Sequence, residues 1–532
     1  MQMLEKYFDT AFDAPDGIKK LRELILTLAM QGKLVHQDPN DQPASELLKG
    51  QSKHSSIEPN EKLFKLPNSW EWVKLGNISH IERGGSPRPI QAFLTSDNDG
   101  LNWIKIGDTD KGGKYITSTK EKIKPEGLSK TRKVYPGDFL LTNSMSFGRP
   151  YISQIEGCIH DGWLRISPPE ILDKEFLYFL LSSPYVNQFF VSVAAGAVVS
   201  NLNADKVRGL VIPLPPQKEQ QRIVEKINQL MALCDELEKL KEQKEAKKLT
   251  VHKSAINQLL DSKDVINSQK GWHFISNHFN DLYTVKKNVS ELRSAILQLA
   301  MQGKLVPQNP NDKPASELLK EIEKDKQPLV SKPEQLYTIP NNWIFTNLKN
   351  ISDINGGYAF KSSQYTKEGI RVIRISDFDE RGIKNDSIIR HPFFDKLNNF
   401  KIEENDILMA MTGGTVGKSY FVKTVTEPMF TNQRVATIKI NKTINQEYIY
   451  SVVKSENVQK VIQNAKNSTN DNISMSDISN FIIPLPPLNE QQRIVEKINQ
   501  LMALCDDLEK QIENSSSKQT ELLNAIMSNL GK

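Results

Sequence analysis

Apolar residues in two stretches of the chain recur at alternating spacings of four and three. This spacing places them along one face of an α-helix and is typical of a coiled-coil seam. The pattern predicts two long helices, the first of about 40 residues and on the order of 60 Å in length. The seam residues are Ile223, Ile227, Leu230, Cys234 and Leu237 in the first helix and Ile494, Ile498, Leu501, Cys505 and Leu508 in the second.

The same proline-rich segment precedes each predicted helix. Ile-Pro-Leu-Pro-Pro begins at Ile212 and again at Ile483, and from Glu219 and Glu490 a long stretch repeats without a change. Consecutive prolines fix φ near −65° and exclude helix. Both segments are therefore predicted to be extended and to deliver the chain to a helix start.

A second repeat shows that the whole plan is duplicated. Residues 28–35 read Leu-Ala-Met-Gln-Gly-Lys-Leu-Val, and residues 299–306 repeat them. The Leu-Arg pair that precedes them recurs at an offset of 292 − 21 = 271, and the proline segment recurs at 483 − 212 = 271. One shared offset predicts an internal pseudo-two-fold, the single-chain counterpart of a symmetric dimer. A molecule with this symmetry is suited to binding a ligand that has two similar ends.

Between the helical parts the pattern changes to short strand-like runs separated by Gly and Pro turns, which predicts an α+β fold. Gly32 is the expected stop of the first repeated helix, and residues 261–290 are polar and expected to be irregular. The predicted organisation is a helical segment at 1–49, an α+β domain at 50–211, a central repeated region at 212–320, a second α+β domain at 321–482 and a long helix at 483–532. The helical parts are nearly identical, which suits binding of a shared partner. The α+β domains have diverged, which suits binding of two different targets.

Composition narrows the class of protein. The 532 residues carry a net charge of +5, and the three cysteines form neither a disulfide framework nor a metal cluster. Cys234 and Cys505 are equivalent seam positions and are expected to be packing residues. The N-terminus does not resemble a signal peptide, and no apolar run approaches a membrane span of roughly 20 residues. We expect a soluble, cytoplasmic protein.

Apparent catalytic motifs are incomplete. Gly413–Ser419 imitates a phosphate-binding loop, but Thr412 stands where the pattern needs glycine, so a turn between strands is expected. The residues His160-Asp161 have no nucleophile that the sequence places beside them, which favours a structural role. The sequence therefore predicts a binding protein without catalytic residues, bound metal or bound cofactor.

Basic residues on the predicted loops favour a nucleic-acid partner, although an ordinary solvated surface would explain many of them. Lysine and arginine suit phosphate contacts, and arginine and glutamine suit the edges of guanine and adenine. The candidates are Arg83, Arg88, Lys105, Lys111, Arg132, Lys133 and Arg149 in the first domain and Lys361, Arg374, Lys418, Gln433 and Arg434 in comparable places of the second.

Two diverged domains, each followed by Ile-Pro-Leu-Pro-Pro…Glu-Gln-Gln-Arg-Ile-Val and a long helix, closely resemble the specificity subunit of type I restriction–modification systems. The resemblance covers essentially the whole chain, most specifically at 212–230 and 483–501. The turns Gly356–Ser362 and Gly413–Ser419 look like recurring turns of the family's target recognition domains, and Gly84–Pro87 and Ser146–Arg149 stand in the corresponding places. These turns add the candidate DNA-binding residues Ser86, Ser146, Tyr358, Ser362, Thr412 and Thr415.

The resemblance implies a mechanism. Each recognition domain would read one half of a bipartite, asymmetric double-stranded DNA site. The long helices would pack antiparallel as a spacer and set the gap between half-sites at about one helical turn, roughly 34 Å. Two methylation subunits would dock on the repeated helices, bring S-adenosylmethionine and flip an adenine. Restriction subunits would add ATP- and Mg-dependent translocation and cleavage.

Two other functions stay open at this point. A solitary DNA methyltransferase or nuclease is opposed by the missing cofactor and metal motifs. A coiled-coil scaffold that does not bind DNA is allowed by the duplicated helices, but it leaves the large diverged domains without a purpose.

Overall fold

The computed structural model describes residues 2–49, 57–58, 64–110, 112–143, 148–195, 202–261, 265–323, 337–466 and 471–530. It divides into two compact units. The first combines Met1–Gln243 with Ser515–Lys532, and the second is Lys244–Asn514. Each unit therefore holds one of the predicted α+β domains together with helical segments from separate parts of the chain.

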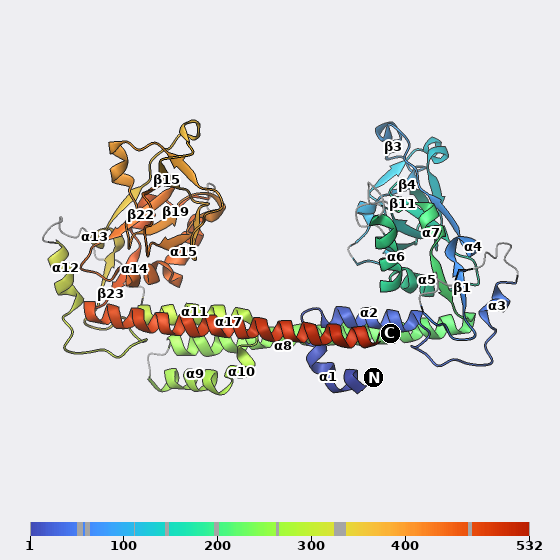
Figure 1. Ribbon diagram of the computed structural model, residues 1–532, viewed down its shortest axis with the longest axis horizontal. Helices are drawn as coiled ribbons and strands as arrows, with labels where there is room; N and C mark the ends of the chain where they lie inside the picture. Colours follow the sequence, from blue (N-terminus) through green and yellow to red (C-terminus); the bar gives the residue numbers. More distant parts are fainter. Residues whose placement is uncertain are drawn as a thin grey trace. The chain divides into compact units, whose positions relative to one another are not determined.

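Among its described residues the first unit has three sheets, with strand orders β1-β12, β3-β6-β4-β10-β7 and β2-β11-β8-β9-β5. In Figure 1, β3 and β4 lie at the end of the domain away from α2, and α5 and α6 lie nearer to α2. The strands are β1 (Glu71–Lys74), β2 (His80–Arg83), β3 (Leu94–Thr95), β4 (Leu101–Ile104), β5 (Tyr115–Ile116), β6 (Glu121–Ile123), β7 (Arg132–Val134), β8 (Phe139–Thr142), β9 (Pro150–Ser153), β10 (Gly157–Ile159), β11 (Trp163–Ser167) and β12 (Val211–Leu214). The helices are α1 (Gln2–Phe12), α2 (Gly17–Met30), α3 (Ala44–Leu47), α4 (Leu75–Ile78), α5 (Lys174–Leu181), α6 (Pro184–Ala195), α7 (Ala204–Arg208) and the start of α8 (Gln217–Asp261).

The second unit repeats this plan with sheets β13-β23, β14-β22-β19-β20, β18-β15-β21 and β16-β17. Its β15 lies at the end of the domain away from α11 and α17 (Figure 1). The strands are β13 (Ile344–Asn347), β14 (Ser352–Gly356), β15 (Ile370–Ile373), β16 (Phe378–Asp379), β17 (Gly382–Ile383), β18 (Ile389–His391), β19 (Ile407–Ala410), β20 (Ser419–Phe421), β21 (Met429–Thr431), β22 (Val435–Ile440) and β23 (Ile482–Leu485). The helices are α9 (Val265–Asn277), α10 (Phe279–Leu282), α11 (Lys286–Met301), α12 (Ala315–Glu323), α13 (Leu348–Ile351), α14 (Gln446–Val453), α15 (Glu456–Lys466), α16 (Met475–Ser479) and the start of α17 (Leu488–Leu530).

The proline-rich segments are extended, as predicted. Pro213 in β12 is paired with Trp72, and Pro484 in β23 is paired with Phe345. Both strands belong to two-stranded sheets, where a proline can turn its missing N–H away from the partner strand. The long helix begins shortly after each strand, α8 at Gln217 and α17 at Leu488.

The identical residues at each helix start hold the α+β domain of their own unit. The buried Glu219 accepts hydrogen bonds from Trp70 Nε1 at 3.0 Å and Gln37 Nε2 at 2.5 Å. Burial raises the pKa of Glu219, and these two donors act in the opposite direction. Arg222 pairs with Asp41 at 2.5 Å. The repeat is thus explained in part by docking inside each unit.

The second copy builds the same contacts. Glu490 accepts hydrogen bonds from Trp343 Nε1 at 3.0 Å and from Gln308, and Arg493 pairs with Asp312 at 2.6 Å. Burial likewise raises the pKa of Glu490. The network recurs with the same side-chain types, at the offset of 271 for all pairs except Trp70 and Trp343, which are 343 − 70 = 273 apart. This recurrence accounts for the identity of the two copies.

Gly32 follows the end of α2 with φ +68°, and Gly303 follows α11 with the same φ. A Cβ on Gly32 would lie 2.4 Å from Pro67 Cγ, and one on Gly303 would lie 2.4 Å from Pro340 Cγ. Each glycine therefore supplies both a left-handed helix end and a close approach to the Pro-Asn-x-Trp segment of the domain. The predicted helix stop at Gly32 is confirmed.

The seam residues are buried mainly by neighbours from their own unit. Ile223, Ile227 and Cys234 join a core with α2 and the first α+β domain, and Leu230 packs against it partly buried. In the second unit Ile494, Ile498 and Cys505 are buried, with Leu501 and Leu508 packed against the same core. Leu237 is 37% exposed, so the buried part of the first seam ends before this residue.

The ends of the long helices lie in different units. α8 begins in the first unit and ends in the second, whereas α17 begins in the second and ends in the first. In the first unit Leu523 and Ile526 of α17 form a buried cluster with Ala11, Phe12 and Ala14. Each long helix thus contributes residues to both units.

The prediction of an irregular segment at 261–290 is wrong for its described part. Residues 265–277 and 279–282 are helical, and α11 already begins at Lys286. Ile275, Leu282 and Tyr283 are buried in the core that includes Ala255 and Leu259 of α8. These few apolar residues suffice because α8 supplies a packing surface that the polar composition of the segment did not reveal.

No single helix among the described residues is long and apolar enough to cross a membrane. The bent pair Lys174–Leu181 and Pro184–Val193 passes that test by length and composition only. Its residues Phe176, Leu177 and Leu180 are buried in the core of the first domain. Their apolar character is explained by this packing.

The turn before β19 contains a buried carboxyl group, Asp406, which accepts a hydrogen bond from the Glu403 N–H at 2.8 Å and lies 3.7 Å from Lys439. Burial raises the pKa of Asp406 from 3.8 to about 6. The protonated Asp406 therefore stabilises the folded state at pH values below the ordinary pKa of an aspartate. This contribution is lost as the pH rises through about 6. We expect the free energy of unfolding of the second unit to lose up to roughly 3 kcal/mol over this range.

Replacing Asp406 by asparagine removes the titration and is expected to flatten this dependence. Urea unfolding of both proteins between about pH 4 and pH 7 measures the effect. The free energies of unfolding of the two proteins are compared at each pH, because other carboxyl groups titrate in both. An identical pH dependence in the variant would contradict the assignment.

Candidate nucleic-acid interface

In the second domain the carboxyl ends of four strands meet at residues 432–434. The backbone N–H groups of Gly357 and Tyr358, after β14, donate to Val435 O at 3.1 Å and Thr431 O at 2.9 Å. Asn432 N donates to Ile373 O of β15, and Met411 N, after β19, donates to Arg434 O, both at 2.9 Å. The loops that carry most of the predicted contact residues are thereby brought to one place.

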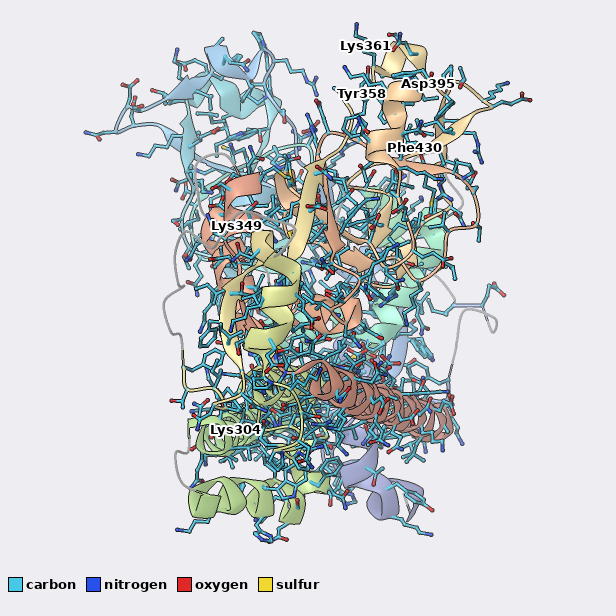
Figure 2. The ribbon with its side chains drawn as sticks, turned by 90° about the vertical axis from the view of Figure 1, so that its left-hand side faces the viewer. Lys304, Lys349, Tyr358, Lys361, Asp395 and Phe430 are labelled. Atoms are coloured by element: carbon cyan, nitrogen blue, oxygen red, sulfur yellow. The ribbon has the colours of Figure 1, made fainter. Side chains whose placement is uncertain are left out.

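Long polar side chains surround this place. Lys361, Lys418, Gln433 and Arg434 are exposed, and none of them has a side-chain partner in the part of the chain that the structure describes. A Cβ on Gly413 or Gly414 would meet nothing within 4 Å, so the loop between β19 and β20 is open to a ligand. Figure 2 places Tyr358 and Lys361 at the end of the domain away from Lys304. The surface offers unpaired donors together with free access.

The first domain builds the same frame from different residues. Gly84 N and Gly85 N donate to Trp163 O at 2.9 Å and Ile159 O at 3.2 Å. His160 N donates to Ile104 O at 3.4 Å, and Asn143 N to Gly162 O at 3.0 Å. The segment 160–162 therefore corresponds to 432–434.

This correspondence places candidate residues of the two domains in pairs. Thr142 N donates to Arg149 O at 3.1 Å, as Ala410 N donates to Lys418 O at 2.8 Å. Lys105 N donates to Asp108 Oδ2 at 2.8 Å, as Arg374 N donates to Asp377 Oδ2 at 3.0 Å. Because Gly84 corresponds to Gly357, Arg88 corresponds to Lys361, each being four residues further along its loop. Three basic positions are thus shared although the sequences differ.

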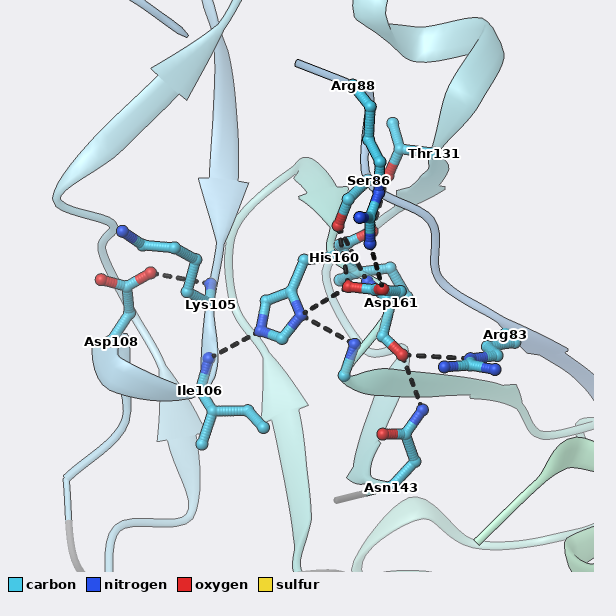
Figure 3. A network of polar contacts seen from close by, with 12 residues as sticks. Arg83, Ser86, Arg88, Lys105, Ile106, Asp108, Thr131, Asn143, His160 and Asp161 are labelled. Atoms are coloured by element: carbon cyan, nitrogen blue, oxygen red, sulfur yellow. Dashed lines mark hydrogen bonds and ion pairs between the residues drawn. The ribbon is translucent and has the colours of Figure 1, made fainter. Parts of the chain in front are cut away.

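A polar network organises the meeting point of the first domain (Figure 3). His160 Nδ1 accepts from the Gly162 N–H at 2.7 Å, and the opposite ring nitrogen, Nε2, lies 3.2 Å from Ile106 N. Burial lowers the pKa of His160, with Asp161 acting in the opposite direction. The ring therefore holds the turn at Gly162 and lies beside the loop at Ile106, which agrees with the structural role predicted for it.

Asp161 is the acidic centre of the network. Ser86 Oγ donates to its Oδ1 at 2.8 Å, Arg88 lies 3.5 Å from its Oδ2, and Arg83 Nε donates to its backbone oxygen at 3.1 Å. Burial acts to raise the pKa of Asp161, but the Ser86 hydroxyl and the nearby positive charge outweigh it, and the pKa lies below its ordinary value. The carboxylate is ionised and orients the loop at 83–88.

Comparisons with known proteins decide the family. The model described as the type I restriction modification DNA specificity domain matches residues 67–248 and 340–515. The chain belongs to this family. The two matches begin at Pro67 and Pro340, the residues that pack against Gly32 and Gly303, so each copy of the family domain spans one α+β domain and the start of its long helix.

Individual members of the specificity family cover nearly the whole chain. The EcoAI specificity subunit of Escherichia coli is 31% identical, over 96% of this chain and 93% of its own length. The EcoEI specificity subunit of the same organism is 28% identical over the same shares. A solved chain from work on complex assembly and conformational transition of the type I R-M system has a TM-score of 0.52 at 20% identity, over 88% of this chain and 99% of that one. The last likeness shows the shared fold alone.

Several candidate contacts of this specificity-family chain are already engaged by carboxylates. Lys105 pairs with Glu121 at 2.6 Å, Arg132 with Glu82 at 3.2 Å and Lys133 with Glu156 at 2.5 Å. The Glu156 hydrogen bond raises the pKa of Lys133. Arg374 forms two bonds of 2.8 Å with Asp377. These four residues are less available to DNA than the unpaired cations.

The hydroxyl candidates also differ in position. Ser362 is exposed, Ser86 is held by Asp161, and Thr415 Oγ1 donates to Thr412 O at 3.3 Å. Thr412 Oγ1 is buried and has no hydrogen-bond partner within the described ranges. Lys111 and Ser146 lie outside the described residues, and Arg149 is exposed. Whether any of them contacts DNA stays a prediction.

One aromatic residue in the same part of the second domain was missed by the sequence reasoning. Phe393, after β18, is 50% exposed, and its ring lies 6.1 Å from that of Phe430. Tyr358 packs between Phe394 and Phe400 and is half-buried. The sequence signal for an exposed aromatic residue was the run Pro392-Phe393-Phe394 between two strands, because two aromatic rings in a turn cannot both be buried easily.

Proposed function

We propose that this chain is the non-catalytic, DNA-binding specificity subunit of a type I restriction–modification complex, in which each α+β domain reads one half of a bipartite DNA site. One observation carries the proposal. In each domain four strand ends converge on a short turn surrounded by exposed donors, and the two domains differ in the side chains at that turn. Phosphate contacts from the unpaired cations would position the DNA, and side chains at the turn would contact base edges.

The long helices would set the distance between the half-sites and dock two methylation subunits, to which restriction subunits are added. S-adenosylmethionine, ATP and Mg would be carried by those partner subunits, and the complex would act in the cytoplasm. Support for two equal docking sites comes from Leu233 and Leu504, which are identical positions of the repeat and are 59% and 61% exposed.

The function is tested by sequencing the methylome of a host that expresses this chain with its methylation subunit, against a host without the chain. A motif with methylated adenine in both halves and a fixed gap is expected. Exchange of residues 321–482 for those of another family member should then change one half only. An assembled complex that adds no methylation would contradict the proposal and favour a scaffold.

Replacing Leu233 by glutamate is expected to release one methylation subunit, and replacing Leu233 and Leu504 together is expected to release both. A charge at the centre of an apolar contact weakens binding by about 2 kcal/mol or more. Mass photometry of the mixed subunits measures the stoichiometry.

Leu240→Glu is the matched control, because Leu240 is 54% exposed on the same helix but corresponds to Gln511 in the second copy. This variant should keep both subunits. If the double variant also kept both, the docking surface would lie elsewhere.

A further inference from the structure

The meeting point of each domain is a turn closed by the same backbone hydrogen bond. Trp163 N donates to His160 O at 3.2 Å, and Val435 N donates to Asn432 O at 2.8 Å. The central residues of the turns are Asp161-Gly162 in the first domain and Gln433-Arg434 in the second. Any side chain at these central positions lies where the four strand ends converge.

The first residue of each turn folds back onto the turn itself. His160 Nδ1 accepts from Gly162 N–H at 2.7 Å, and Asn432 Oδ1 accepts from Arg434 N–H at 3.3 Å. Because the side chain of the first residue is used inside the turn, the next residue, Asp161 or Gln433, is the first in the turn whose side chain can contact a ligand. Asp161 therefore occupies the position at which the second domain presents an exposed glutamine amide.

The Asp161 carboxylate retains hydrogen-bonding capacity. Its Oδ1 accepts from Ser86, whereas Oδ2 lies 3.5 Å from Arg88. The Arg88 side chain is 82% exposed and the Asp161 side chain is 43% exposed. An exposed ion pair of this kind contributes little and is readily exchanged for another partner. Oδ2 can thus accept a hydrogen bond from a ligand.

The charge of Asp161 selects the kind of ligand group. A carboxylate repels phosphate oxygens, so Asp161 cannot serve as a backbone contact. It accepts from the amino groups that bases present in the major groove, which are cytosine N4 and adenine N6. Arg83 and Arg88 keep the surroundings positive, which allows a carboxylate to approach DNA.

We propose that Asp161 is a specificity-determining residue of the first domain and accepts a hydrogen bond from an exocyclic amino group, cytosine N4 or adenine N6, in its half-site. The inference rests on the proposed function. Ser86 and His160 are positioning residues, because they hold the carboxylate and the turn that carries it.

The test compares the methylomes produced by the wild-type chain, Asp161→Asn and Asp161→Ala, each expressed with the methylation subunit. Asparagine keeps an acceptor for Ser86 but adds an amide donor, which suits adenine N6 and N7. We expect Asp161→Asn to favour adenine at one position of one half-site by roughly ten-fold or more, which changes the preferred base if the wild type reads cytosine and keeps it if the wild type reads adenine. In either case Asp161→Ala should accept all four bases there. The half-site read by the second domain should be unchanged.

Glu170→Gln is the matched control, since it removes an exposed carboxylate of the same domain that pairs with none of the candidate contacts in the described residues, and it should keep the motif. A second readout is competition binding of the purified complexes to duplexes that carry each base pair in turn. If both Asp161 variants keep the wild-type preference, or lose affinity equally for all four base pairs, Asp161 has only a structural role and the inference fails. A wild-type chain without any bipartite motif would instead overturn the proposed function, and this inference with it.

Discussion

Simultaneous replacement of Lys361, Lys418 and Arg434 by glutamate is expected to lower the DNA affinity of the assembled complex by at least about 1,000-fold at moderate salt. These cations surround the turn of the second domain and lack carboxylate partners in the described structure. If each neutralises one phosphate, their loss removes three released counterions, and the slope of log K against log salt should fall by about 2.7. Fluorescence anisotropy over a range of salt concentrations measures both quantities.

The control for this variant carries the same change of charge at the other end of the unit. Lys287, Lys313 and Lys320 lie in or beside α11 and α12 and are exposed. Their replacement by glutamate should leave the salt slope almost unchanged, because long-range repulsion is screened beyond roughly 10 Å. Equal losses in the two variants would mean that net charge, rather than the strand-end surface, governs binding.

Gly303→Ala is expected to destabilise the second unit by about 2–4 kcal/mol. The left-handed φ costs an alanine about 1 kcal/mol, and the new methyl group would overlap Pro340 and approach Trp343, which adds roughly 1–3 kcal/mol. Urea unfolding monitored by tryptophan fluorescence measures the change, and Trp343 lies within 3.3 Å of the added atom. Gly32→Ala should act in the same way on the first unit.

Gly413→Ala separates the two causes. Gly413 has the same φ of +68° and belongs to the same unit, but a Cβ there would meet nothing within 4 Å. Only the conformational cost of about 1 kcal/mol is expected. Equal destabilisation by Gly303→Ala and Gly413→Ala would show that the contact with Pro340 is unimportant.

The helical framework was predictable because its signals are local and duplicated. The seam spacing, the prolines at 213 and 484 and the glycine at 32 each restrict the backbone directly. A common offset of 271 then gave the internal symmetry without any knowledge of the fold. The helices at 265–282 escaped because their stability comes from packing on α8, which a local pattern does not report.

The loops that meet at the candidate site were named from the sequence, whereas their side-chain contacts were not. Its frame consists of backbone hydrogen bonds, which any residue can make, so the two domains keep it while their sequences diverge. The partners that engage Lys105 and Arg132 lie on other strands, at Glu121 and Glu82, and residue spacing does not reveal them. Asp161 was interpreted as structural for the same reason, since its match to Gln433 is visible only in the hydrogen bonds.

The exchange of helix ends between the units has a consequence for biosynthesis. The first unit contains Ser515–Lys532, whereas the second is complete once Asn514 has been made. At roughly 5–20 residues per second, the ribosome needs about 15 to 60 s to proceed from residue 243 to residue 532. During that time the apolar surface of Ala11, Phe12 and Ala14 lacks Leu523 and Ile526. The half of the protein that is synthesised first is therefore the last to be completed, and a nascent chain stalled late in translation exposes a site for chaperones at its oldest end.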